Sequence, residues 1–225
     1  KSSYILLIFK ILLISKNKIV YLHYKILIMN KKYRIIVADP PWQYGSKSAV
    51  NNSNGSEIKK LSEHYKSMST DDIKSLPIKN ILLEDACCFL WVTDSHLKEG
   101  IEVMEKWGFK YKTIAFNWIK TTSKGNICKN VAPWTLKSSE ICLFGTKGKM
   151  TQFKINNSVE SLIFAERNKH SQKPLEYKKR IVEMFGDQPT IELFARDCYD
   201  KWECLGDGLN GEDIRISLTK MIKND

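Results

Sequence analysis

The sequence predicts an α/β fold with a mainly parallel sheet and helices on both faces. Its 225 residues are 43% hydrophobic, which suits one domain with a full core. Short apolar runs alternate with segments whose apolar residues recur at helical spacing. The most distinctive polar residues stand at the carboxyl ends of the apolar runs, where open α/β sheets bind their ligands. We therefore expect a functional site at that edge of the sheet.

Most of the expected elements are delimited by capping or turn residues. Ser69 is expected to cap a short helix that stops before Pro77, and Asp94 to cap a helix that reaches Trp107. Pro174 suits the first turn of a further helix, and Gly186 its end. That helix is expected at residues 175–185, with strands at 35–38, 86–92, 111–120, 139–145, 161–165, 190–195 and 202–205, and polar, lysine-containing loops at 45–60 and 121–133.

The chain is expected to divide into three parts. Residues 1–28 are interpreted as translated upstream sequence or an accessory segment, because Met29 stands just ahead of the first strand. The apolar stretch 4–14 is interrupted by Lys10 and falls short of the roughly 20 residues of a membrane-spanning helix, although a weak interfacial anchor is an alternative. Residues 29–211 are expected to form the domain, and residues 212–225 a C-terminal tail.

Charge and cysteine usage indicate the partner and the compartment. The formal net charge of +11 favours a polyanionic partner such as nucleic acid. Four histidines, none paired at helical spacing, argue against a zinc site. The cysteines form no C-x-x-C pair and are expected to be reduced, mostly buried thiols of a cytoplasmic protein: Cys87, Cys88, Cys128, Cys142, Cys198 and Cys204.

The tetrad of Asp39, Pro40, Pro41 and Trp42, directly after the first apolar run, points to chemistry on a planar base. The N6 amine of adenine is a weak nucleophile because its lone pair is delocalised into the ring. The Asp39 carboxylate can accept one N6 hydrogen and a carbonyl of Pro40 or Pro41 the other, while Trp42 offers a stacking face, typically worth about 1–3 kcal/mol. The structural alternative is a strand-to-loop turn with Trp42 as a core residue.

Eight segments in order resemble the MT-A70 family of S-adenosylmethionine-dependent N6-adenine methyltransferases, over a stretch from about Tyr33 to Gly211. They include Asp-Pro-Pro-Trp at 39–42, His-Ser-Gln-Lys-Pro at 170–174 and Ile-Glu-Leu-Phe-Ala-Arg at 191–196; the others lie at 64–69, 89–93, 107–109, 118–120 and 140–148. The resemblance implies a Rossmann-like methyltransferase fold with a permuted motif order, and S-adenosyl-L-methionine as the cofactor.

The resemblance also implies a cofactor site. It assigns the methionine part of the cofactor to Lys173, which stands just ahead of a helix N-terminus that favours a carboxylate, and the ammonium group to Asp39. A solvated surface lysine is the alternative for Lys173, and a structural ion pair is the alternative for Glu192 with Arg196. Ribose and adenine contacts are implied for Glu192, Phe194, Arg196 and Asp207, the first three of which strand alternation would place on one face.

Substrate contacts are implied for five residues in and around the two polar loops: Tyr44, Tyr65, Lys120, Trp134 and Lys137. Lysines suit phosphates and aromatic rings suit a flipped base, although a charge run is also typical of a solvated face.

The expected activity is a site-specific adenine DNA methyltransferase, because the chain lacks the long extension of the eukaryotic mRNA enzymes. The alternatives are the same reaction on RNA, or a non-catalytic nucleic-acid-binding subunit, which the intact tetrad disfavours. A methyltransferase acting on protein amides would be expected to carry Asn-Pro-Pro-Tyr at 39–42. No metal and no membrane partner are expected, and the resemblance leaves open a homodimer or a heterodimer with a paralogous subunit.

Overall fold

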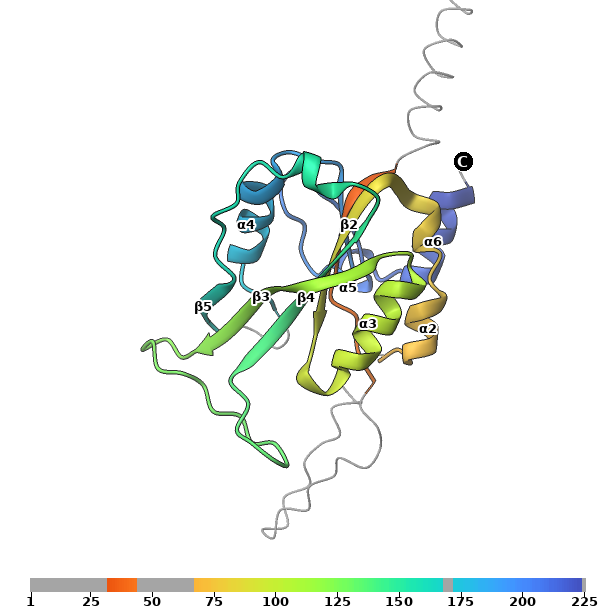
Figure 1. Ribbon diagram of the computed structural model, residues 1–225. Helices are drawn as coiled ribbons and strands as arrows, with labels where there is room; N and C mark the ends of the chain where they lie inside the picture. Colours follow the sequence, from red (N-terminus) through yellow and green to blue (C-terminus); the bar gives the residue numbers. More distant parts are fainter. Residues whose placement is uncertain (1–31, 44–66, 168–171, 224–225) are drawn as a thin grey trace, which may run out of the picture.

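A computed structural model describes residues 32–43, 67–167 and 172–223, which form a seven-stranded sheet between helices (Figure 1). The sheet order is β5-β3-β4-β2-β1-β6-β7. The strands are β1 (Tyr33–Ala38), β2 (Leu82–Val92), β3 (Lys110–Thr121), β4 (Ser139–Lys147), β5 (Leu162–Glu166), β6 (Thr190–Leu193) and β7 (Glu203–Leu205).

The mainly parallel sheet expected from the sequence is confirmed, with one reversed strand. β1 pairs in parallel with β2 and β6, β3 with β5, and β6 with β7. β4 lies antiparallel between β2 and β3. Because β4 is reversed, its first residues lie at the edge where β1, β2 and β3 end.

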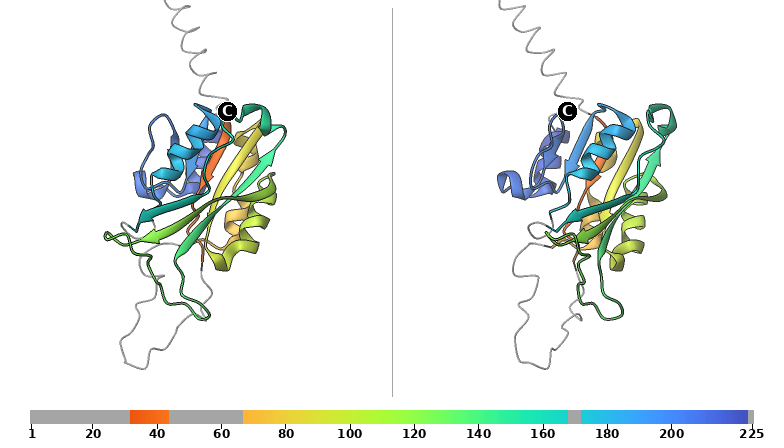
Figure 2. Two further views of the ribbon diagram at one scale, coloured as in Figure 1. Left: turned by 60° about the vertical axis from the view of Figure 1, so that its left-hand side comes forward. Right: turned by 90° about the vertical axis from the view of Figure 1, so that its left-hand side faces the viewer.

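Helices cover both faces of the sheet, as the fold class requires. α2 (Thr70–Ser75), α3 (Leu97–Lys106) and α6 (Ile214–Lys223) contribute to one buried apolar cluster. α4 (Glu176–Phe185) contributes to the other cluster, on the opposite side of the sheet from α3 (Figure 2). The short elements are α5 (Asp207–Asn210) and the 3-10 helices η2 (Ile78–Ile81), η3 (Asp94–His96) and η4 (Met150–Phe153).

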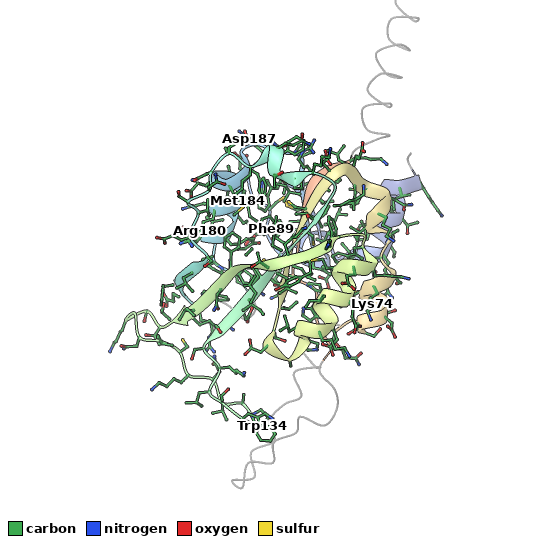
Figure 3. The ribbon with its side chains drawn as sticks, viewed as in Figure 1. Lys74, Phe89, Trp134, Arg180, Met184 and Asp187 are labelled. Atoms are coloured by element: carbon green, nitrogen blue, oxygen red, sulfur yellow. A yellow bond between two sulfur atoms is a disulfide. The ribbon has the colours of Figure 1, made fainter. Side chains whose placement is uncertain are left out.

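The continuous apolar run in β2 follows from burial on both faces. Phe89 and Trp91 belong to the cluster under α4, whereas Leu90 and Val92 belong to the cluster under α2 and α3. Phe89 lies close to α4 (Figure 3), with its ring centroid 6.3 Å from that of Phe185. A strand buried on both faces loses the polar alternation of a surface strand, so residues 86–92 of β2 are apolar without interruption.

Arg180 of α4 protects one edge of the sheet. Its Nη1 donates to the carbonyls of Glu160 and Leu162, each at 2.7 Å, and its side chain is labelled on α4 in Figure 3. These contacts occupy backbone acceptors along the outer side of β5. An unprotected edge strand would leave such acceptors free to pair with another chain.

The capping predictions are confirmed at two helices and wrong at a third. The Ser69 side chain accepts from the Asp72 N–H at 3.1 Å, and Gly186 ends α4 with a φ of 68°. Asp94 does not cap α3, because the chain first forms the 3-10 turn η3 and α3 begins at Leu97.

The expected strand at 190–195 is shorter in the structure. β6 ends at Leu193 because Phe194 has a φ of 63°, which takes the backbone out of the extended region. Glu192, Phe194 and Arg196 therefore do not share a face by strand alternation, and that part of the prediction is wrong.

The C-terminal residues expected as a tail are part of the packed unit. Ile214 and Leu218 of α6 are 5% and 0% exposed and belong to the cluster formed by α2 and α3. Residues 214–223 therefore contribute to the core, and the expected boundary at residue 211 is wrong. The expected segment 1–28 lies outside the described residues.

Two of the six cysteines contradict the expectation of free thiols. Cys198 and Cys204 form a disulfide with a Cα–Cα distance of 5.7 Å. The chain turns back between β6 and β7, which brings these two residues together. Cys87, Cys88 and Cys142 are buried free thiols, as expected, and burial raises the pKa of each.

Candidate functional site

Asp39 lies directly after β1, at the carboxyl end of the central strands. Its side chain is 29% exposed, and its Oδ2 lies 2.6 Å from Nζ of Lys173. Among the described residues, Oδ1 has no recorded hydrogen-bond partner. Burial raises the pKa of Asp39, although the charge of Lys173 opposes that shift. One carboxylate oxygen of Asp39 is therefore tied down, and the other remains available as an acceptor.

Lys173 bridges Asp39 to an acid that the sequence analysis did not select. Nζ of Lys173 also lies 3.1 Å from Oε2 of Glu140, the second residue of β4. Oε1 of Glu140 in turn lies 2.5 Å from Nζ of Lys120 at the end of β3. The result is an alternating chain of charges, Lys120–Glu140–Lys173–Asp39, which joins the end of β3, the start of β4 and the end of β1, and which we call the Asp39 ion chain.

The alternating charges stabilise one another's ionised forms. Burial acts to raise the pKa of Glu140, but Lys173 and Lys120 outweigh it, so that the pKa of Glu140 lies below its usual range. Burial likewise acts to lower the pKa of Lys173, but Asp39 and Glu140 outweigh it and raise that pKa. Lys173 therefore stays protonated across the neutral range.

The backbone after Asp39 presents two carbonyls in a rigid turn. The carbonyl of Pro40 accepts the Trp42 N–H at 2.9 Å, and that of Pro41 accepts the Met68 N–H at 2.8 Å. A carbonyl oxygen has two lone pairs, so each retains capacity for a second donor. The expected role of a proline carbonyl as an acceptor is compatible with these contacts.

Trp42 does not offer the stacking face expected of it. Its side chain is 7% exposed, its Nε1 donates to the Trp91 carbonyl at 3.0 Å, and its ring stacks on His96 with centroids 5.3 Å apart. The indole is folded back under the end of β2 and belongs to the core. Its role in this structure is to fix the turn that carries Asp39.

A cleft beside Asp39 gathers five of the six predicted cofactor residues. Asp207 is not among them, because it opens α5 and its side chain is exposed. The cavity volume is about 40 Å³, so a nucleoside-sized ligand requires side chains that line the cleft to move. The lining residues are Asp39, Gln172, Lys173, Tyr177, Lys178, Glu192, Phe194, Ala195, Arg196 and Asp197.

A second buried cluster in this cleft was missed by the sequence analysis. Nζ of Lys178 lies 2.6 Å from Oε2 of Glu192 and 3.2 Å from Oδ1 of Asp197, and the Tyr177 hydroxyl donates to Oε1 of Glu192 at 2.8 Å. Burial raises the pKa of Glu192 and, together with the nearby carboxylate, that of Tyr177. The sequence signal that could have revealed it is Lys178, a lysine next to the apolar residues Tyr177 and Ile181 of α4.

The predicted substrate residues are dispersed. Tyr44 and Tyr65 lie outside the described residues. Lys120 is 15% exposed and pairs with Glu140, so it belongs to the Asp39 ion chain. Lys137 pairs with Asp94 at 2.9 Å, and Trp134 is 95% exposed at the tip of the long loop between β3 and β4 (Figure 3).

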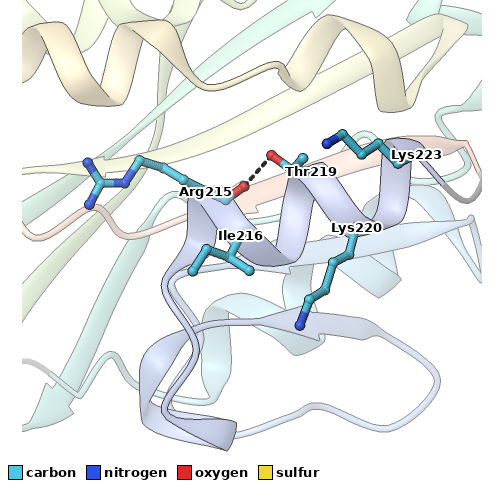
Figure 4. A pocket seen from close by; sticks show the side chains of 5 residues that line it. All are labelled: Arg215, Ile216, Thr219, Lys220 and Lys223. Carbon is cyan, nitrogen blue, oxygen red and sulfur yellow. Dashed lines mark hydrogen bonds between the residues drawn. The ribbon is translucent and has the colours of Figure 1, made fainter.

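A second hollow, on α6, shows no comparable chemistry. It measures about 300 Å³ and is lined by residues of that helix alone: Arg215, Ile216, Thr219, Lys220 and Lys223 (Figure 4). Within residues 32–43, 67–167 and 172–223, no group of three His, Cys, Asp or Glu side chains could hold a metal ion. In the same ranges, no helix has the length and apolar character needed to cross a bilayer.

The chain is similar in sequence to a known protein family and to several of its members. Residues 33–208 match the MT-A70 family. The chain is 33% identical to the Type II methyltransferase M.MunI of Mycoplasma sp over 196 residues, which are 83% of this chain and 82% of that protein.

Larger eukaryotic proteins match the same part of the chain. It is 29% identical to the human N(6)-adenosine-methyltransferase catalytic subunit METTL3 over 185 residues, and 29% identical to an Arabidopsis thaliana N(6)-adenosine-methyltransferase MT-A70-like protein over 184 residues. Each match covers 80% of this chain but only 29% and 24% of those relatives. The chain thus spans most of M.MunI and about a quarter of the eukaryotic relatives.

Proposed function

The chain belongs to the MT-A70 family, and from this premise we propose that it transfers a methyl group from S-adenosylmethionine to N6 of adenine in DNA. The observation that carries the proposal is the state of Asp39. It stands at the carboxyl end of β1 with one oxygen held by Lys173 and the other available to a donor.

The protein's part in the reaction is to localise the N6 lone pair. Oδ1 of Asp39 accepts one N6 hydrogen, and the carbonyl of Pro40 accepts the other through its second lone pair. S-adenosylmethionine, the methyl donor of MT-A70 methyltransferases, supplies an electrophilic methyl group on a sulfonium. As N6 bonds to the methyl carbon and the carbon–sulfur bond breaks, Asp39 stabilises the charge that develops on N6. The surplus N6 proton then leaves to water.

The donors and acceptors of the cleft fit the polar groups of this methyl donor. Lys173 is a cation for its carboxylate, and Oδ2 of Asp39 has a second lone pair for its ammonium group. Glu192 can accept from a ribose hydroxyl only by sharing an oxygen that already accepts from Tyr177 or Lys178. Phe194 adds an aromatic side chain to the lining of the cleft.

The comparisons favour DNA over RNA as the substrate, whereas the charge only favours a nucleic acid. The chain is strongly basic, with a formal charge of +11, which suits either polyanion. The relative that it covers almost throughout is a type II methyltransferase, whereas it matches only a quarter of the adenosine methyltransferases. We assign it on the same grounds to the cytoplasm, with assembly as a homodimer or with a paralogous subunit as a further proposal.

The direct test is a transfer assay with labelled S-adenosylmethionine on unmethylated genomic DNA and on a matched RNA transcript, with Asp39→Asn as the blank. We expect incorporation into DNA that sequencing assigns to N6 of adenine. Incorporation confined to RNA would defeat the choice of substrate, and incorporation at a protein amide would defeat the proposed reaction.

A further inference from the structure

The loop between β3 and β4 carries an apolar tip on a fixed base. Asn130 and Lys137 exchange two backbone hydrogen bonds, at 2.9 and 2.8 Å, and close a six-residue tip loop, residues 131–136. Arg167 donates to Oδ1 of Asn130 at 3.0 Å, and Lys137 pairs with Asp94. The tip loop is therefore anchored to two other parts of the molecule.

Water surrounds the apolar side chains of the tip loop. Trp134 is 95% exposed, Val131 87% and Leu136 56%. Pro133, next to Trp134, restricts the backbone at that point. Large apolar side chains grouped on an anchored projection mark a surface that binds something.

The charge around the tip loop identifies a polyanion as its occupant. Residues 121–139 contain three lysines and no acid, and because Lys137 pairs with Asp94, the net positive charge comes from Lys124 and Lys129. Interfaces between proteins are depleted in lysine, whereas nucleic-acid surfaces combine lysines with exposed aromatic rings. An aromatic ring among lysines therefore fits a nucleic acid better than a second protein.

The tip loop is built on the same strands as the Asp39 ion chain. The loop leaves β3 just after Lys120 and enters β4 just before Glu140, and these two residues lead through Lys173 to Asp39. Asp39 is only 29% exposed, so an adenine must leave the duplex stack to present its N6 there. A base that leaves the stack opens a gap, which an apolar side chain of the protein can fill.

We propose that Trp134 is a wedge that enters the duplex and occupies the gap left by the flipped adenine, so that the substrate is double-stranded DNA. This inference rests on the proposed function and adds the strandedness of its substrate. The tip loop then holds the duplex open while Asp39 and Pro40, directly after β1, hold the adenine.

The experiment compares Trp134→Ala with the wild type on one unmethylated genomic DNA, offered native and heat-denatured, with labelled S-adenosylmethionine. We expect a loss of at least about tenfold on native DNA and of less than about threefold on denatured DNA, because single strands need no wedge. Trp134→Phe should retain most of the activity on native DNA. Ile155→Ala, which removes an apolar side chain that is 70% exposed near the far end of α4, should change neither value.

Several results would overturn the wedge. Equal losses on native and denatured DNA would make Trp134 a general contact, and no loss on either would remove its role. A wild type active only on denatured DNA or RNA would refute the wedge and leave adenine methylation standing, whereas inactivity on every nucleic acid would refute both. Light scattering of wild type and variant tests whether the tip loop instead binds a second protein chain. If Trp134→Ala loses an oligomer that the wild type forms, and loses equal activity on both DNA substrates, the tip loop is a subunit interface.

A binding measurement keeps the test independent of turnover. Once the methylated adenine is mapped, 2-aminopurine at that position in a duplex should brighten with the wild type, because the flipped base leaves the stack. Trp134→Ala should give a several-fold smaller rise. An equal rise with both proteins would show that flipping does not depend on Trp134.

Discussion

Lys173 and Lys178 meet carboxylates in one cleft, but they leave those carboxylates in different states. Lys173 precedes α4, is 9% exposed, and contacts a single oxygen of Asp39. Lys178 lies inside α4, is 5% exposed, and shares Glu192 with the Tyr177 hydroxyl, so that both oxygens of Glu192 are occupied. Asp39 therefore keeps one oxygen for a ligand, whereas both oxygens of Glu192 already accept hydrogen bonds within the fold.

The difference indicates which contacts are reactive and which are structural. A donor that approaches Asp39 finds an unshared oxygen, whereas a ribose hydroxyl that approaches Glu192 must share an oxygen with Tyr177 or Lys178. Lys178 compensates a buried carboxylate, and removal of one partner of such a pair is costly. We therefore expect substitutions at Asp39 and Lys173 to act on activity and cofactor binding, and substitutions at Lys178 to act on stability.

The largest effect is expected for Asp39→Asn. The amide cannot provide the negative charge that stabilises the reacting N6, so the rate of methyl transfer should fall by about 1,000-fold. The free energy of unfolding should change little, because Lys173 keeps Glu140 as a partner. Single-turnover transfer assays and urea denaturation measure the two quantities. Asp71→Asn, which alters a fully exposed acid, is the matched control, and retention of more than a few per cent of activity by Asp39→Asn would contradict the assignment.

Lys178→Met should show the opposite profile. It leaves Glu192 buried without a cation, so we expect a loss of about 3 kcal/mol in the free energy of unfolding, measured by urea denaturation. The double variant Lys178→Met/Glu192→Gln should recover most of that loss, because the uncompensated charge is removed as well. A double variant as unstable as the single one would mean that Lys178 acts through packing instead of charge.

Lys173→Ala should mainly weaken the binding of S-adenosylmethionine. Loss of the cation that faces the cofactor carboxylate should raise the dissociation constant by about tenfold, as measured by calorimetry. Its effect on the melting temperature should be smaller than that of Lys178→Met. An unchanged dissociation constant would refute the cofactor role of Lys173 and favour a purely structural ion pair.

The smallest effect is expected in the pH dependence of Glu140→Gln. Asp39 must be ionised to accept an N6 hydrogen. Because burial raises its pKa above the usual 3.8, activity should be lost as the pH falls through that raised pKa. Glu140 also acts to raise that pKa, because its negative charge opposes a second one nearby. Its removal should therefore move the acid limb of kcat/KM to lower pH. Glu102→Gln, an acid of α3 paired with Lys74, should leave the limb in place, and a limb displaced to higher pH would contradict the assignment.

Local sequence signals predicted the elements that carry the site. The apolar run before Asp39 predicted the end of a strand, and Pro174 and Gly186 predicted the two ends of a helix. Both elements lie close to their predicted positions. These features depend on neighbours in the chain, which a single sequence contains. The family resemblance then directed attention to Lys173 and Glu192, both of which line the cleft.

Features that depend on distant contacts could not be predicted in the same way. The left-handed φ of Phe194 ends β6 two residues early, and nothing in the run Ile-Glu-Leu-Phe-Ala-Arg announces it. Trp42 reads as a stacking surface until its partner His96 is known. Glu140 lies within the matching segment 140–148, but its contact with Lys173 depends on the reversal of β4, which a periodicity of two cannot reveal.

The closed base of the tip loop bears on how this enzyme family diversifies. Because Asn130 and Lys137 pair across that base, residues could be inserted or exchanged between them without shifting the register of the strand that follows. Recognition of a new target sequence could then evolve in a short exchangeable segment. Glu140, three residues after Lys137, would keep its place, and the chemistry would be inherited unchanged.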